Sequence, residues 1–183
     1  MLKEINASTI IEESLAFSFG LEKYKKIMLM VQKVDVSQDR EFQKVFNGFY
    51  RVRRGRDWRT DFFSLFQEKK NIAPSFEEII TALYKMTGNV EASFSSKMIA
   101  TLNDGMPIWD QYILENLGLK LNGHKQEKLM NAIAMYKDIC DWYTSYLQTE
   151  NAKECISKFD ESLPKFSWLS EVKKIDCFLW SMR

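Results

Sequence analysis

The sequence predicts an all-α protein: a compact globular array of about nine helices that forms a single domain over residues 1–183. Between the few glycines and prolines, apolar residues recur at intervals of three and four, which is the helical period. Hydrophobic residues make up 45% of the chain, enough to build one core at a length of 183 residues. No run alternates like a β-strand, and no repeat or low-complexity linker divides the chain.

The first half of the chain is expected to form five helices, separated by turn and capping residues. They are expected at 9–17, at 21–34 after Gly20, around 42–49 with Ser37 as N-cap, around 58–66 after Gly55, and from Ser75 to Gly88. The last pair of boundaries is the most specific, because Ser75 and Glu78 spell a capping box and Gly88 suits a helix C-terminus.

The second half of the chain is expected to form five more helical segments. They are expected at 93–102, from Pro107 to Gly118, after His124 over about six turns, at 152–159 and at 170–181. Pro107 suits the first turn of a helix because its missing N–H needs no partner there. The last helix is hydrophobic, so we expect it to dock onto the core.

The overall charge argues against whole-protein attraction to a polyanion. Lys and Arg total 26 against 25 Asp and Glu, which gives a net charge of +1. Any contact with nucleic acid must therefore come from a local patch. The N-terminus lacks a signal-peptide pattern, and the apolar stretches are too short to span a bilayer. We therefore expect a cytoplasmic protein with no membrane partner.

Several enzyme classes lose support because the residues that they need are missing. No glycine-rich phosphate loop is present, and His124 is the only histidine. No metal site and no cofactor are expected: Asp138 and Asp141 fit a solvated helix face, and His124 fits a solvated helix start. The three cysteines, Cys140, Cys155 and Cys177, lack a nearby basic activator, which favours packing in the core. Their odd number and the absence of a C-x-x-C pair favour a reducing compartment.

Residues 49–59, here called the arginine segment, are the strongest charge anomaly in the chain. Five arginines lie in nine positions, flanked by Tyr50 and Trp58; they are Arg51, Arg53, Arg54, Arg56 and Arg59. Guanidinium groups bind phosphates through paired N–H donors, which makes the arginine segment a candidate nucleic-acid contact. The alternative is internal pairing, for which the nearest acidic residues in the sequence are Glu41, Asp57 and Asp61.

A second candidate region begins with a hairpin at Met86-Thr87-Gly88-Asn89-Val90-Glu91-Ala92-Ser93 and continues through Pro107-Ile108-Trp109-Asp110 to Leu117-Gly118-Leu119. This order resembles the helix-hairpin-helix DNA glycosylase superfamily over about residues 80–119. The resemblance implies that amides of the hairpin, at Gly88 and Asn89, hold a DNA phosphate. It also implies that Asp110 is the catalytic aspartate that stabilises the cationic sugar or positions the nucleophile.

The sequence also departs from the pattern of that superfamily. Val90 replaces the second hairpin glycine, and Trp109 is an additional residue before the aspartate. Ala92 stands where the bifunctional branch has its amine nucleophile, and Lys97 lies more than a turn further on, so a Schiff-base lyase reaction is not expected. If the protein is an enzyme, the sequence favours a monofunctional, aspartate-dependent glycosylase. The structural alternative for Asp110 is a carboxylate in the first turn of the Pro107 helix, where it stabilises the helix dipole.

Two functional hypotheses follow from these patterns. The first is a DNA-binding protein with a glycosylase-like helical fold, which contacts duplex DNA through the hairpin and the arginine segment. The second is a protein-interaction or assembly module without nucleic-acid binding, in which exposed aromatic residues anchor a protein partner or a second copy. The candidate anchors are Phe62, Phe66 and Trp180. The sequence specifies neither a base or lesion nor an oligomeric state.

Overall fold

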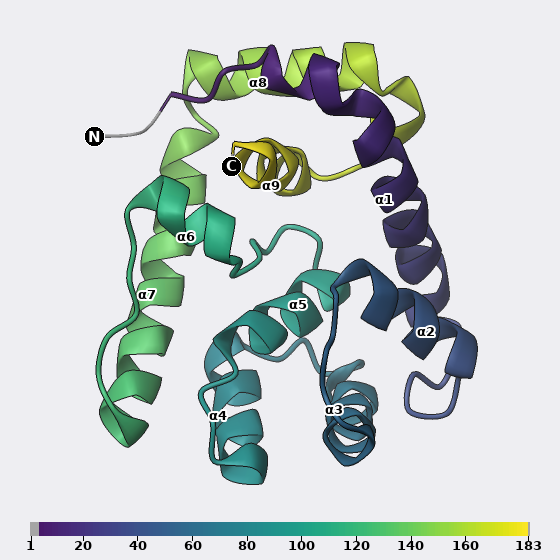
Figure 1. Cartoon of the computed structure of the whole chain (residues 1–183), viewed down its shortest axis with the longest axis vertical. Helices are drawn as coiled ribbons and strands as arrows, with labels where there is room; N and C mark the ends of the chain where they lie inside the picture. Colours follow the sequence, from purple (N-terminus) through teal and green to yellow (C-terminus); the bar gives the residue numbers. More distant parts are fainter. Residues whose placement is uncertain (1–3, 183) are drawn as a thin grey trace.

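The computed structural model describes residues 4–182, without the side chains of residues 9–17 and 19, and confirms the all-α prediction. Over this range the chain forms nine α-helices and one short 3-10 helix, and no strand (Figure 1). The elements are α1 (Thr9–Val31), α2 (Arg40–Phe49), α3 (Arg56–Lys69), α4 (Phe76–Thr87), α5 (Ala92–Leu102), α6 (Gln111–Leu117), α7 (Lys125–Tyr146), α8 (Glu150–Ser162), η1 (Pro164–Phe166) and α9 (Glu171–Ser181).

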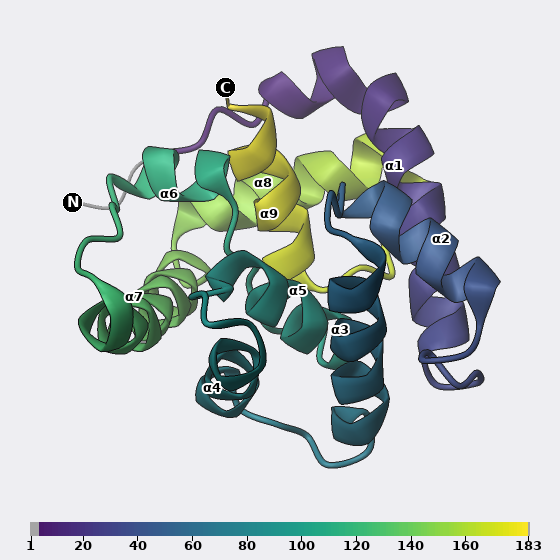
Figure 2. The same cartoon turned by 60° about the horizontal axis from the view of Figure 1, so that its bottom comes forward.

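The C-terminal helix α9 lies in the middle of one half of the molecule, with α1, α6, α7 and α8 around it (Figures 1 and 2). It packs against α1, α6 and α8, and Ile175, Phe178 and Leu179 are fully buried. Asn116 of α6 donates its side-chain N–H to the carbonyls of Leu179 and Met182, which satisfies acceptors that the helix end leaves open. The expectation that the last helix docks onto the core is therefore confirmed.

The opposite half of the core is aromatic, and it is built by α2 and α3. Rings on these two helices pack at 5.3 to 6.3 Å between centroids, mostly edge to face, in the arrangement that favours aromatic pairs. The rings are those of Phe42, Phe46, Phe62, Phe63 and Phe66, all fully buried. Phe62 and Phe66 are thus unable to serve as exposed anchors for a partner, and that part of the interaction hypothesis is wrong.

Several predicted helix boundaries are confirmed, with the capping chemistry on which they were based. Ser75 and Glu78 form a reciprocal capping box at the start of α4. Gly88 and Gly118 follow α4 and α6 with φ angles of 71° and 68°, in the left-handed region that glycine adopts without strain. These local signals suffice because each involves only residues within one helical turn.

Two predicted boundaries in the first half of the chain are wrong. Gly20 does not end a helix: α1 runs through it, because packing against α2, α8 and α9 outweighs the roughly 1 kcal/mol that glycine costs in a helix. Ser37 does not cap α2. Asp39 does, accepting from the amide of Phe42 at 2.7 Å, while Ser37 donates to Asp35 in the preceding turn.

The expected helix start at Pro107 is also wrong. Residues 107–110, here called the Asp110 corner, are not helical, and α6 begins at Gln111 with Asp110 as its N-cap. Hydrogen bonds from other elements hold the corner in place of helical ones. This difference matters for function because it moves Asp110 out of a helical turn and onto the edge of a cavity.

Among the described residues, no helix is both long enough and apolar enough to cross a membrane.

Candidate functional site

A cavity of about 490 Å³, here called the site cavity, brings together segments that are far apart in the sequence. Its lining comes from α1, the end of α2, α5, the Asp110 corner, α6 and α9. Four cationic and two acidic side chains contribute to it: Lys23, Arg51, Lys97 and Lys173 against Asp110 and Asp176. The excess of positive charge favours an anionic ligand.

Asp110 is half-buried and lines the site cavity. Its Oδ1 accepts from the backbone N–H of Tyr112 at 3.1 Å, so it caps α6 from outside rather than sitting in a first helical turn. No salt bridge of Asp110 is found among the described residues. Capping uses only one carboxylate oxygen and leaves the second one available to the cavity. Asp110 can therefore both cap α6 and take part in chemistry in the cavity.

Lys97, which the sequence analysis set aside as a nucleophile, belongs to the site. It lies on α5, is only 8% exposed, and lines the same cavity as Asp110. Its Nζ donates to Ser93 Oγ at 2.9 Å and lies 5.4 Å from the ring centre of Phe94. Burial lowers the pKa of Lys97, Lys173 adds to the lowering, and the charge of Asp110 opposes it. The available signal was a single lysine inside a helix otherwise made of small, hydroxyl and apolar residues.

Two hydrogen bonds from different helices fix the Asp110 corner. The backbone N–H of Trp109 donates to Ser96 Oγ of α5 at 2.7 Å, and Tyr136 of α7 donates its hydroxyl to the carbonyl of Pro107 at 2.7 Å. All four residues are buried. Ser96 and Lys97 are neighbours on α5. The hydrogen bond between Trp109 and Ser96 therefore fixes the Asp110 corner relative to the helix that carries Lys97.

Arg51 is the arginine of the arginine segment that lines the site cavity. It is exposed, and its guanidinium lies 5.7 Å from the ring centre of Trp180. Its φ angle of 52° places a residue with a β-carbon in the left-handed region. Backbone strain of this kind is found preferentially at functional sites.

The remaining arginines divide into two groups. Arg54 donates to both carboxylate oxygens of Glu91, at 2.9 and 2.7 Å, and its guanidinium also lies near the rings of Trp58 and Phe94. Arg54 is thus paired internally, but its partner is Glu91 and not one of the acidic residues nearest in the sequence. One of those residues, Glu41, pairs with Lys26. Arg53 and Arg56 are exposed and Arg59 is half-buried.

The hairpin is exposed at Gly88 and Asn89, but the amides of these two residues are used inside the chain. Gly88 N–H donates to the Tyr84 carbonyl at 2.8 Å, and Asn89 N–H donates to Thr87 Oγ1 at 3.1 Å. These two amides are therefore not free to hold a phosphate in this structure. Within the described residues, the hairpin amides without a hydrogen-bond partner are those of Val90, Glu91, Ala92 and Ser93. The arginine segment and the hairpin are joined by the pair between Arg54 and Glu91.

On the α9 side, the site cavity is lined by a buried ion pair. Lys173 Nζ and Asp176 Oδ2 lie 3.5 Å apart, and both residues are less than a tenth exposed. Burial raises the pKa of Asp176 to about 6 although Lys173 and Tyr143 oppose the rise. The pKa of Lys173 is raised, because Asp176 and Tyr50 together outweigh its burial.

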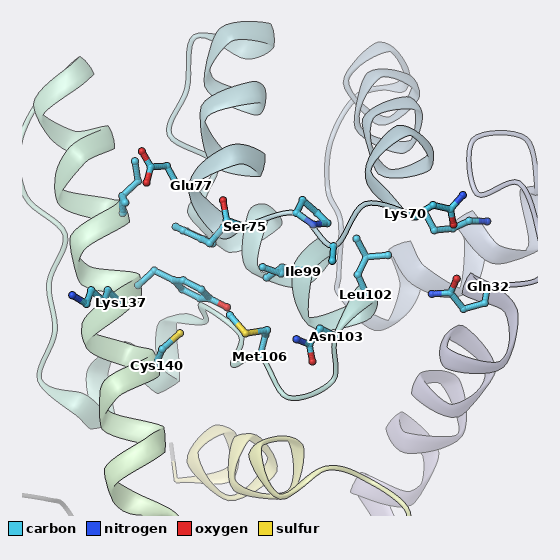
Figure 3. Close-up of a pocket in the computed structure, with 16 residues that line it drawn as sticks. Gln32, Lys70, Ser75, Glu77, Ile99, Leu102, Asn103, Met106, Lys137 and Cys140 are labelled. Carbon is cyan, nitrogen blue, oxygen red and sulfur yellow. The ribbon is translucent and has the colours of Figure 1, made fainter.

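A second cavity of about 740 Å³ shares no residue with the site cavity. Ile99, Leu102 and Met106 lie in it, between Cys140 of α7 on one side and Gln32 and Lys70 on the other (Figure 3). None of the predicted site residues lines it. Burial raises the pKa of Cys140 to about 11, which makes its thiol a poor nucleophile.

The other candidate residues take structural positions. Cys155 and Cys177 are buried, as expected for core packing. His124 is exposed and precedes α7 but makes no capping hydrogen bond through its side chain. Asp138 and Asp141 are exposed, and no group of three metal-ligating side chains occurs in the part of the chain that the structure describes. Comparison of the chain with family models, with curated proteins and with solved structures finds no match in any of the three.

Proposed function

We propose that the protein binds duplex DNA and that the site cavity receives one nucleotide extruded from it. One observation carries this proposal: Arg51 and Asp110, singled out in two separate segments, line a single cavity with the buried amine of Lys97. A charge patch on a neutral protein is common. A cavity that joins an anion-attracting rim to a carboxylate and a desolvated amine is a far more specific combination.

Contacts with the DNA backbone would come from the exposed part of the arginine segment. Arg53 and Arg56 are exposed, and neither forms an ion pair among the described residues. Arg51 would meet the backbone at the mouth of the cavity. Guanidinium groups release counterions when they neutralise phosphates, so this contact would be strongly dependent on salt.

The site cavity has the lining that an extruded base needs. Four aromatic side chains line it: Phe49, Tyr50, Tyr112 and Trp180. Enzymes that act on a base in a duplex turn it out of the stack and hold it between aromatic or apolar side chains. The cavity would therefore hold the base while Lys97 and Asp110 face the sugar.

Asp110 and Lys97 together would supply the chemistry of base excision. A fixed carboxylate stabilises the positive charge that develops on the sugar as the base departs. An amine whose pKa is lowered by burial is neutral more often and can attack C1′ of the sugar. The distance of Lys97 from the hairpin argued against a lyase reaction; its position beside Asp110 in one cavity now supports one.

DNA binding is tested by the salt dependence of affinity for a short duplex. The double variant Arg53→Ala, Arg56→Ala is expected to bind more weakly and to reduce the slope of log affinity against log salt by about 2. Arg40→Ala is the matched control, because Arg40 is exposed on α2 outside the arginine segment. Equal slopes in the parent and the double variant would reject the arginine segment as the contact.

Catalysis is tested by release of free base from damaged duplexes. Asp110→Asn keeps a side-chain oxygen for the Tyr112 amide but removes the charge, and it is expected to slow release by roughly 100-fold or more. Asp138→Asn, at an exposed carboxylate, serves as the control. Full activity of Asp110→Asn would remove Asp110 from the mechanism. Self-association on gel filtration without any shift on adding DNA would favour the interaction module.

A further inference from the structure

We propose that Asp176 is the general acid of the site and gives a proton to the base as its bond to the sugar breaks. Because this role belongs to the cavity in which base excision is proposed, it rests on the proposed function. Asp176 is outside both segments that the sequence singled out, and it reaches the cavity from α9.

The geometry leaves one oxygen of Asp176 free for a ligand. The side chain is 2% exposed, and Oδ1 accepts from the hydroxyl of Tyr143 at 2.5 Å. Among the described residues Oδ2 accepts no hydrogen bond, and Lys173 Nζ lies 3.5 Å from it, beyond the usual length of a hydrogen bond. The backbone N–H of Ile108 also interacts with the carboxyl group of Asp176 and opposes the rise of its pKa. A buried oxygen without a partner is rare in folded proteins and marks a place where a ligand or a proton is accommodated.

The two carboxyl groups of the site cavity lie in different environments. Asp110 is half-buried, and its Oδ1 accepts the backbone N–H of Tyr112. Asp176 is desolvated, and burial raises its pKa to about 6. When one cavity holds two carboxyl groups in unlike surroundings, the exposed one acts as the charge stabiliser and the desolvated one as the acid.

The titratable groups that interact electrostatically with Asp176 come from several packed elements, and among them only Lys173 is cationic. They are Lys173 and Cys177 on α9, Tyr136 and Tyr143 on α7, Tyr24 on α1, and Tyr50 at the end of α2. Burial raises the pKa of Tyr143 and Cys177, so both stay neutral near pH 7. Asp176 is thus the acidic group of this cluster that can lose a proton near neutral pH.

The lone pair of neutral Lys97 forms a bond to C1′, and the electron pair of the bond between C1′ and the base nitrogen moves to the base. The proton on Asp176 Oδ2 passes to the base, which leaves neutral. Lys97 carries the positive charge that results, Asp176 becomes a carboxylate, and water later returns its proton. Proton transfer of this kind contributes typically 100-fold to 10,000-fold to a rate.

The test compares two leaving groups in otherwise identical duplexes, one containing hypoxanthine and one containing 7-methylguanine. A 7-methylated purine already carries a positive charge and leaves without a proton, whereas hypoxanthine needs one. Asp176→Asn is expected to slow release of hypoxanthine by roughly 100-fold or more, and that of 7-methylguanine by much less. A merely structural role would slow both equally, and equal slowing would overturn the assignment.

A second measurement needs no variant that might fail to fold. In the parent protein, release of hypoxanthine should fall as the pH rises above about 6, as Asp176 loses its proton, relative to release of 7-methylguanine. A constant ratio of the two rates from pH 5 to pH 8 would contradict a general acid with this pKa. If the parent releases neither base from any duplex, the proposed function itself fails; if it releases both at a constant ratio, only the role of Asp176 fails.

Discussion

The backbone N–H of Trp109 donates to Ser96 Oγ at 2.7 Å, and this bond joins the corner that carries Asp110 to the helix that carries Lys97. Ser96 is fully buried, and its own hydroxyl donates to the carbonyl of Ser93. Ser96 therefore directly connects the two segments that carry Asp110 and Lys97.

Replacing Ser96 by Ala should destabilise the protein and loosen the Asp110 corner. The buried Trp109 amide would lose its acceptor, at a cost of about 1–3 kcal/mol in the free energy of unfolding. Ser95→Ala is the matched control: Ser95 is equally buried, but its hydroxyl only supplements the backbone bonds that the Glu91 carbonyl already accepts. Denaturant unfolding of both variants checks this, and equal losses would show that the corner does not depend on Ser96.

The pair between Arg54 and Glu91 makes Arg54 a structural arginine. Arg54→Ala would leave the buried Glu91 carboxylate without its partner, and we expect a loss of about 1–2 kcal/mol, between the values for exposed and buried pairs. Arg53→Ala, at an exposed neighbour, should change stability by less than about 0.5 kcal/mol. The double variant Arg54→Ala, Glu91→Gln should recover part of the loss in thermal unfolding. No recovery would mean that the packing of Arg54 against Trp58 and Phe94 dominates.

Arg51 should combine a stability cost with a functional gain. Its left-handed backbone is strained for any residue with a β-carbon, so Arg51→Gly should be more stable than Arg51→Ala by roughly 1 kcal/mol. Both substitutions remove the guanidinium and should weaken binding of duplex DNA to the same extent. Unfolding and binding curves for the two variants separate backbone from side chain. Greater stability of the alanine variant would refute the strain.

The amine of Lys97 should titrate below its ordinary pKa of 10.5, mainly because it is buried. The unfolded chain then binds more protons than the folded one between the two values, so stability should increase as the pH rises through the folded-state pKa. Reductive methylation with ¹³C-formaldehyde followed by NMR titration measures the folded-state pKa directly. Lys85, exposed on α4, is the internal reference. If the measured pKa of Lys97 equals that of Lys85, the Lys97 amine is solvated and the prediction is wrong.

Much of the fold could be predicted from the sequence because its signals are local. The capping box at Ser75 and the left-handed glycines at 88 and 118 involve neighbours within one turn. The errors at Gly20 and Pro107 have the opposite cause. Packing of α1 against distant helices carries it through the glycine, and bonds from Ser96 and Tyr136 hold the proline segment out of a helix.

The site was predictable only in part, for the same physical reason. Asp110 and the arginines stood out as a motif and as a charge cluster. Lys97 was set aside and Asp176 was not singled out, because the importance of each depends on burial beside groups from other elements. The partner of Arg54 was likewise hidden, since Glu91 lies in a different candidate motif.

The claim that the site cavity acts on DNA is tested most directly by borohydride trapping on a duplex with one abasic site. An amine at C1′ forms a Schiff base with the opened sugar, and borohydride converts it to a stable covalent adduct. The parent and Lys85→Met are expected to give the adduct, and Lys97→Met is expected to lose it. Adduct formation by Lys97→Met at the rate of the parent, or none by the parent, would contradict the account.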